Sequence, residues 1–156
     1  MIIAHAPAGY MLACICDRPF DRDQVVFWSI LAGSVAPDLD MLRFVFLDGG
    51  AVHHHSYFTH DPTVWAGVLT LGFVATSRVL IGVGLGALLH MVLDTIVGAV
   101  SWGWGDLSVS GPLITVPATQ SHWVLSFLLH WTMLIELVIC AGAARMYWLR
   151  RKARAA

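Results

Sequence analysis

The chain has 156 residues, of which 58% are hydrophobic and only 12% are charged, and its mean hydropathy is +0.72. Soluble domains have about a quarter of their residues charged, so this composition excludes an ordinary soluble protein and favours one helical membrane domain. The net charge of −1 hides a basic cluster at residues 145–156, which fits a membrane surface better than nucleic acid.

Hydrophobic patterning predicts five apolar helical segments. In chain order they cover residues 2–16, 24–36, 62–77, 79–100 and 121–148. The last segment is the one comfortably long enough to cross a bilayer, because a span takes about 20 residues. The others carry Pro, Gly or polar residues at one end, which a membrane tolerates where they are buried in protein or line a wet cavity. We therefore expect an all-α, polytopic membrane bundle of four or five helices, with a membrane domain at 1–149 and a basic cytoplasmic tail at 150–156.

Basic residues indicate how the segments thread the membrane. Lys and Arg concentrate on the cytoplasmic side of membrane proteins. With the C-terminus placed in the cytoplasm, five alternating spans put eight of the nine basic residues on that side and leave only Arg43 outside. The same threading puts Trp28, Tyr147 and Trp148 near the inner interface, as an aromatic belt requires. We expect a multi-pass plasma-membrane protein in contact with the lipid bilayer and with no nucleic-acid partner.

Histidines and carboxylates gather at the opposite, outer ends of these segments. They are His5, Asp38, Asp40, His53, His54, His55, His60, Asp61, His90, Asp94 and His122. Burying so many ionisable groups without partners costs several kcal/mol per charge, which a metal would relieve. The sequence therefore predicts a His/Asp cluster at one face of the bundle.

Spacing within this cluster is typical of metal chemistry. His90 and Asp94 are four residues apart and share one helix face. Asp38 and Asp40 follow Pro37, so both carboxylates can point to a common centre. Imidazole with carboxylate suits zinc, with manganese or iron as alternatives, and a site with two or three metals would support hydrolysis. Each pair also has a simpler interpretation, a hydrogen-bonded pair or a capped helix end.

Four motifs in order resemble those of the YdjM-like family, which is classed as LexA-regulated inner-membrane metal-dependent hydrolases. They are His5 to Gly9, Pro37 to Asp40, His55 with Thr59 and His60, and His90 to Asp94 followed by Gly98 and Pro112. Ser56 and Asp61 depart from the family pattern, where Arg and Ser stand, and the adjacent histidines leave the register of His55 open by one residue. The His and Asp pattern is also similar, more weakly, to that of zinc-dependent phospholipase C enzymes.

The resemblance implies an inner-membrane protein with a divalent metal, zinc first, and Thr59 orienting a neighbouring ligand. The expected metal ligands are His5, Asp38, Asp40, His54, His55, His60, His90 and Asp94. One of His54 and His55 pairs with His60, and Asp40 is the expected catalytic carboxylate. The leading hypothesis is hydrolysis of a lipid or lipid-linked phosphoester at the outer face. The rival is a metal-ion carrier or binding protein, which would need ligands through the full bilayer depth, where only His130 and Glu136 lie.

Overall fold

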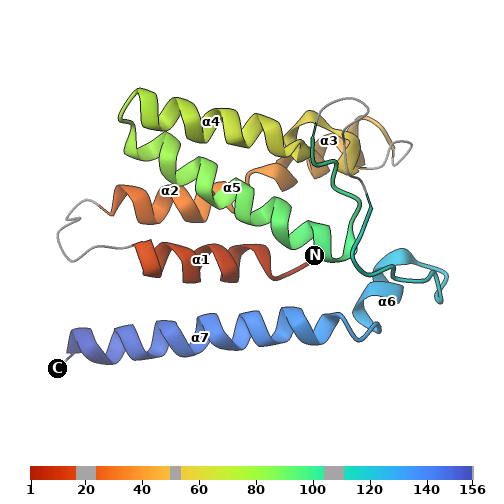
Figure 1. Cartoon of the computed structure of the whole chain (residues 1–156). Coiled ribbons are helices and arrows are strands. Elements are labelled where there is room, and N and C mark those ends of the chain that lie inside the picture. The colour runs from red at the N-terminus through yellow and green to blue at the C-terminus, as the bar shows by residue number, and fades with distance from the viewer. Residues whose placement is uncertain (17–23, 50–53, 104–110, 156) are drawn as a thin grey trace.

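The structure is a computed structural model that describes residues 1–16, 24–49, 54–103 and 111–155 (Figure 1). Its elements are helices, as the composition predicts. The α-helices are α1 (His5–Cys16), α2 (Val25–Gly33), α3 (Asp40–Phe46), α4 (Pro62–Val74), α5 (Arg78–Val97), α6 (Trp123–Leu128) and α7 (Met133–Ala155). Three 3₁₀ turns, η1 (Pro37–Leu39), η2 (His54–Ser56) and η3 (Phe58–His60), lie between α2 and α4.

The long helices run side by side along one direction, and successive ones alternate in polarity (Figure 1). Helix α5 is central, because α2, α4 and α1 all pack on it, while α7 packs on α1 at the outside of the bundle. The start of α1, the 3₁₀ turns, α3 and α6 lie at one end, which we call the site end. The C-terminus of α7 and the α4–α5 turn lie at the other, which we call the basic end (Figure 1).

Capping side chains explain where α4 and α5 begin. Asp61 accepts hydrogen bonds from the backbone N–H and the hydroxyl of Thr63, at 2.8 and 2.7 Å, and Pro62 occupies the first helical position. This combination is typical of a helix start. Ser77 caps α5 in the same way through the N–H of Leu80, at 3.4 Å. Asp61 fixes the start of α4. His60, which comes directly before Asp61, therefore enters the bundle at a defined position.

Helices α2 and α5 approach so closely that only glycine fits between their backbones. A Cβ on Gly86 would lie 2.1 Å from the carbonyl oxygen of Ile30, and a Cβ on Gly33 would lie 2.2 Å from that of Val83. Small residues allow such backbone contact between apolar helices. The contact sets the position of His90, which follows Gly86 by one turn.

One continuous helix over 121–148 is a wrong expectation. The chain forms α6, turns at residues 129–132 and resumes as α7. His130 Nδ1 lies 3.0 Å from the Thr132 hydroxyl and accepts a hydrogen bond from the Thr132 N–H at 3.4 Å. Such local bonds compete with helix geometry. Helix α7 then continues to Ala155, so the residues expected as a tail from 150 form its last turns.

Helix α5, with 20 residues, is the described helix that is long and apolar enough to cross a membrane. From the sequence, 79–100 is expected as one of five spans, but 121–148 as the segment comfortably long enough. Helix α2 and the segment Pro37–Phe46 pass the same test together, with a bend of 50° between them. The segment 40–61, expected to be a connection, contains α3 and two of the 3₁₀ turns. Length and composition therefore support one or two spans directly.

Gly86→Ala should lower the free energy of unfolding by about 1–3 kcal/mol, because the new methyl group would overlap the α2 backbone. The matched control is Gly67→Ala in α4, where a Cβ meets no atom within 4 Å. That change should raise stability by about 0.5–1 kcal/mol, since glycine weakens a helix interior. Thermal unfolding in detergent measures both, and equal effects would contradict the close α2–α5 contact.

Candidate metal centre

Seven ionisable side chains meet at the site end of the bundle. They are His5 at the start of α1, Asp38 in η1, Asp40 at the start of α3, His55 in η2, His60 at the end of η3, and His90 and Asp94 in α5. His5, Asp40, His60, His90 and Asp94 are buried. The structure thus brings together residues up to 89 positions apart in the sequence, which no single segment could do.

The Asp94 carboxylate is at the centre of this cluster. Its Oδ1 lies 3.0 Å from His5 Nε2, and the backbone nitrogen of Met1 lies 2.5 Å from the same oxygen. Its Oδ2 lies 3.1 Å from His90 Nε2, 3.5 Å from His55 Nε2 and 3.6 Å from His60 Nε2. The two oxygens of one buried carboxylate therefore face different sets of imidazoles.

Asp38 lies across the cluster from Asp94 and is its most open member. Its Oδ2 is 3.4 Å from His5 Nδ1, and its Oδ1 is 3.5 Å from His90 Nε2 and 3.8 Å from His60 Nε2. The Asp38 side chain is 38% exposed, against 2% for Asp94. A molecule from outside can therefore reach the cluster beside the Asp38 carboxylate.

Asp40 lies behind His60. Its Oδ2 is 2.7 Å from His60 Nδ1 and accepts a hydrogen bond from the Thr59 hydroxyl at 2.5 Å. A carboxylate in this position holds the imidazole in place and makes its far nitrogen more basic. Thr59 was expected to orient a neighbour, and in the structure that neighbour is Asp40.

Hydrogen bonding determines which nitrogens point into the cluster. His90 Nδ1 lies 2.8 Å from the carbonyl oxygen of Ser34. A carbonyl only accepts, so Nδ1 carries the proton and donates it. The Nε2 atom therefore faces the oxygens of Asp38 and Asp94. A lone pair turned toward two carboxylates is repelled unless a positive charge lies between them, either a proton or a metal ion.

The donor atoms could hold a metal ion in three overlapping groups. The groups are His5, His90 and Asp94; Asp38, His60 and His90; and His55, His60 and Asp94, each with its ligand atoms within 4.8 Å of one another. Donors at about 2.0–2.2 Å from one tetrahedral ion lie roughly 3.3–3.6 Å apart. The distances from the imidazole nitrogens to the oxygens of Asp38 and Asp94, from 3.0 to 3.8 Å, surround that value. The cluster fits a divalent metal.

Two further features agree with a metal rather than with protons alone. The rings of His5 and His90 are stacked with their centroids 3.6 Å apart, and two imidazolium ions at that distance would repel each other strongly. In addition, both nitrogens of His5 and the Nε2 of His90 are buried with no hydrogen bond among the described residues. Buried polar atoms without a hydrogen bond are rare in proteins.

His60 shows the electrostatic balance of the cluster. Burial lowers the pKa of His60, but its contact with Asp94 and the negative charge of Asp40 outweigh burial and raise that pKa above its ordinary value. In the absence of metal, His60 therefore binds a proton more readily than an ordinary histidine does. Metal binding must release this proton, so acid should weaken metal binding.

Histidines that looked alike in the sequence have different positions. His55 reaches Asp94, and a Cβ on Gly98 would lie 2.2 Å from His55 Cε1, so Gly98 leaves the space for this ring. His54 begins η2, and His53 lies outside the described residues. His122 is exposed and caps α6.

Glu136, which the sequence marked only as a deep polar residue, supports the cluster from α7. It is buried and accepts hydrogen bonds from the backbone N–H groups of Ile2, Ile3 and Ala4, at 2.6–3.1 Å. These three residues lead directly into His5. Glu136 therefore fixes where α1 begins and where the His5 ring enters the cluster. The sequence signal was a lone carboxylate in an apolar segment.

Comparison of the chain with family models, with curated proteins and with solved structures found no match.

His90→Ala and Asp94→Asn should each weaken zinc binding by about 10-fold or more, because both side chains supply donors to the shared centre. His122→Ala is the control, since this histidine is exposed and outside the cluster. Metal analysis of detergent-purified protein, with and without chelator, measures the effect. Unchanged metal content in both site variants would show that the cluster is not a metal centre.

Glu136→Leu should destabilise the protein and weaken zinc binding, because it leaves buried N–H groups unpaired at about 1–3 kcal/mol each. Glu136→Gln retains one acceptor oxygen, so it should reduce stability and zinc binding by less than Glu136→Leu does. If Glu136 acts through His5, adding Glu136→Leu to His5→Ala should weaken zinc binding no further. Additive losses in the double variant would show that Glu136 influences the cluster by another route.

Proposed function

We propose that the protein is a membrane-embedded, metal-dependent hydrolase that acts on a lipid or lipid-linked phosphoester at the membrane face where the site end lies. The observation that carries this proposal is the buried cluster of three overlapping His/Asp groups, with the half-open Asp38 at its edge. His5 and His90 have ring nitrogens beside two carboxylates with no hydrogen bond among the described residues, and a purely structural use of these two histidines would not leave them so.

Membrane insertion is supported by what the bundle exposes. Its buried core is made largely of small side chains, whereas many large apolar side chains lie on the outside, such as Phe46, Val74 and Leu134. Apolar surface on this scale marks contact with membrane or protein partners. The arginines of α7 lie at the basic end, which fits a cytoplasmic position there and an outer position for the site end.

We propose two metal ions that share Asp94, with zinc as the first candidate and manganese or iron as alternatives. His5 and His90 would hold one ion, and His55 and His60 the other, because both pairs reach the Asp94 carboxylate. A carboxylate that joins two ions is common in centres that cleave phosphoesters. Two such ions would supply hydroxide near neutral pH and offset negative charge on a phosphoryl oxygen.

The chain's own carboxylates then have separate roles. Asp38 is not needed in either of the two groups that contain Asp94, and its exposed side chain can orient a water molecule and accept its proton. Asp40 is engaged with His60 and Thr59. The sequence pointed to Asp40 as the catalytic carboxylate, but this arrangement favours Asp38, with Asp40 as the residue that positions His60.

Membership in the YdjM-like family is part of this proposal. The residues of its four motifs, far apart in the sequence, supply His5, Asp38, His60 and His90 to one cluster. Gly98 of the last motif makes room for His55. Each conspicuous polar position of the pattern thus has a place at or beside the candidate centre.

A metal transporter, the rival function, fits less well. The candidate metal groups among the described residues all lie at the site end. The two residues expected at depth lie close to the site end instead: Glu136 binds the backbone N–H groups that lead into His5, and His130 is in the turn between α6 and α7. A path for an ion would require ligands along the bundle, and these two side chains already have other partners.

Purified protein supplied with zinc or manganese should hydrolyse a phosphoester in a screen of phospholipids, lipid phosphates and generic phosphoesters, and chelator should stop it. Asp38→Asn should lower turnover by about 100-fold and leave most of the metal bound, since it removes a proton acceptor. Asp40→Asn should also reduce bound metal, through His60.

Asp48→Asn is the control, because Asp48 contacts Arg43 and Tyr57 outside the cluster. Its turnover should match that of the unmodified protein. Full activity in Asp38→Asn would remove Asp38 from the chemistry. Bound metal without chelator-sensitive turnover on any substrate would favour a metal-binding protein that is not an enzyme.

A further inference from the structure

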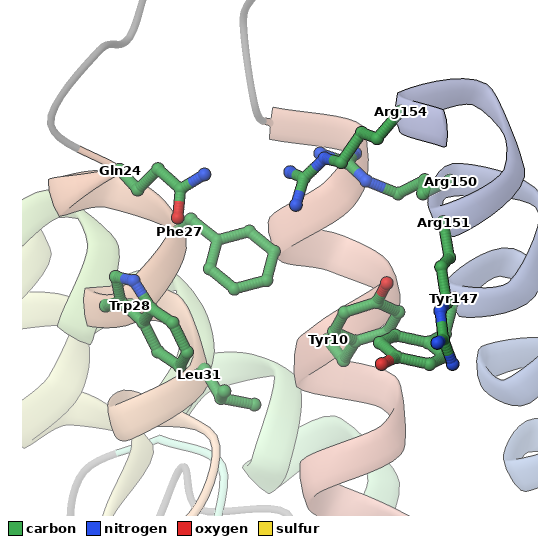
Figure 2. Close-up of a pocket in the computed structure, with 9 residues that line it drawn as sticks. All are labelled: Tyr10, Gln24, Phe27, Trp28, Leu31, Tyr147, Arg150, Arg151 and Arg154. Atoms are coloured by element: carbon green, nitrogen blue, oxygen red, sulfur yellow. The ribbon is translucent and has the colours of Figure 1, made fainter. Parts of the chain in front are cut away.

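A cleft of about 310 Å³ lies at the basic end, far from the His/Asp cluster. Its walls come from α1, α2 and the last turns of α7 (Figure 2). Its lining combines three arginines of α7, Arg150, Arg151 and Arg154, with aromatic and apolar side chains. We call it the arginine cleft. Nothing in the proposed chemistry uses it.

Positive charge dominates the described lining of the arginine cleft. None of the described residues that line it is acidic. Arg150 Nη1 donates to the carbonyl oxygen of Cys14 at 3.3 Å, which ties α7 to α1. Arg151 and Arg154 make no hydrogen bond or ion pair in the described part of the chain. Crowded guanidinium groups favour an anion, and their planar donors match phosphate.

The opposite wall of the cleft is apolar. Helix α2 supplies Phe27, Trp28 and Leu31, and Tyr10 of α1 and Tyr147 of α7 lie across from that wall, below Arg154 and Arg150 in the view (Figure 2). Trp28 is 59% exposed and Tyr147 56% exposed, so both are available to a ligand. A small inorganic anion would use only the arginines. An amphiphile with a phosphate and a hydrocarbon chain would use both walls.

We infer that the arginine cleft binds the phosphate headgroup of an anionic phospholipid, with an acyl chain along α2. The basic end would face the cytoplasmic leaflet, where anionic headgroups and basic side chains meet, and Trp and Tyr favour this interface. The inference rests on the membrane insertion proposed above, and it does not depend on the metal centre or on catalysis.

The test compares lipid binding by two double variants with the same loss of charge. Arg151→Gln with Arg154→Gln removes two arginines of the cleft. Arg145→Gln with Lys152→Gln removes two positive charges of α7 that do not line the cleft. Native mass spectrometry of the full chain in detergent, titrated with phosphatidylglycerol and separately with phosphatidylcholine, gives the apparent Kd of each.

The unmodified protein should bind phosphatidylglycerol more tightly than phosphatidylcholine. The cleft variant should raise the Kd for phosphatidylglycerol by about 10-fold, as expected from the loss of charge-assisted bonds, and the control variant should change it by less than about threefold. Inorganic phosphate at millimolar concentration should not displace the lipid. Helix content and bound zinc should stay the same in both variants, which shows that folding and the metal centre are intact.

An equal increase of the Kd for phosphatidylglycerol in the two double variants would overturn the inference. It would show that the lipid is attracted by the total charge of α7 and not by the arginine cleft. No preference for phosphatidylglycerol in the unmodified protein would also overturn it, as would full displacement by inorganic phosphate. Absence of bound zinc beside a normal lipid preference would count against the proposed hydrolase and leave the arginine cleft supported.

Discussion

The structure depends on one buried negative charge, the carboxylate of Asp94. A carboxylate that is almost completely buried in an apolar helical bundle requires compensating positive charge. The Met1 nitrogen and four imidazoles surround it, and the imidazoles come from α1, η2, η3 and α5. The glycine contact between α2 and α5, the capped start of α4 and the space beside Gly98 bring these elements to one point. The buried charge is stabilised where they meet.

A second group of contacts orients the imidazoles. The Ser34 carbonyl holds His90, Asp40 holds His60, and Glu136 holds the segment that leads into His5. Each contact leaves a ring nitrogen directed at a carboxylate. Such an arrangement has unfavourable electrostatics when it is empty and favourable electrostatics around a cation. The same interactions that make the cluster costly to bury are therefore those that would make it bind a metal tightly, with release of protons.

The two ends of the bundle have different chemistry, and two helices connect them. Helix α1 has His5 at the site end and Tyr10 in the arginine cleft, and α7 carries Glu136 near the first and Arg154 in the second. A phosphate-binding surface at one end and a proposed phosphoester site at the other would anchor the bundle in one leaflet while it acts at the opposite face. Under these proposals α7 would help set the depth and tilt of the protein in the membrane as well as support His5.

Sequence alone determined the helical class, the grouping of histidines and carboxylates, and the residue positions that form the cluster. These features depend on composition and on spacing within one helix, such as His90 with Asp94, and both can be read locally. Sequence did not determine that the helix breaks at 129–132, because the bonds of His130 and Thr132 compete there with helix geometry. Nor did it distinguish the positions of Asp38 and Asp40 in the cluster, identify the partners of Glu136, or reveal the arginine cleft. Those features depend on groups as far as 136 residues apart, which only the packing of α1, α2, α5 and α7 brings within hydrogen-bonding distance.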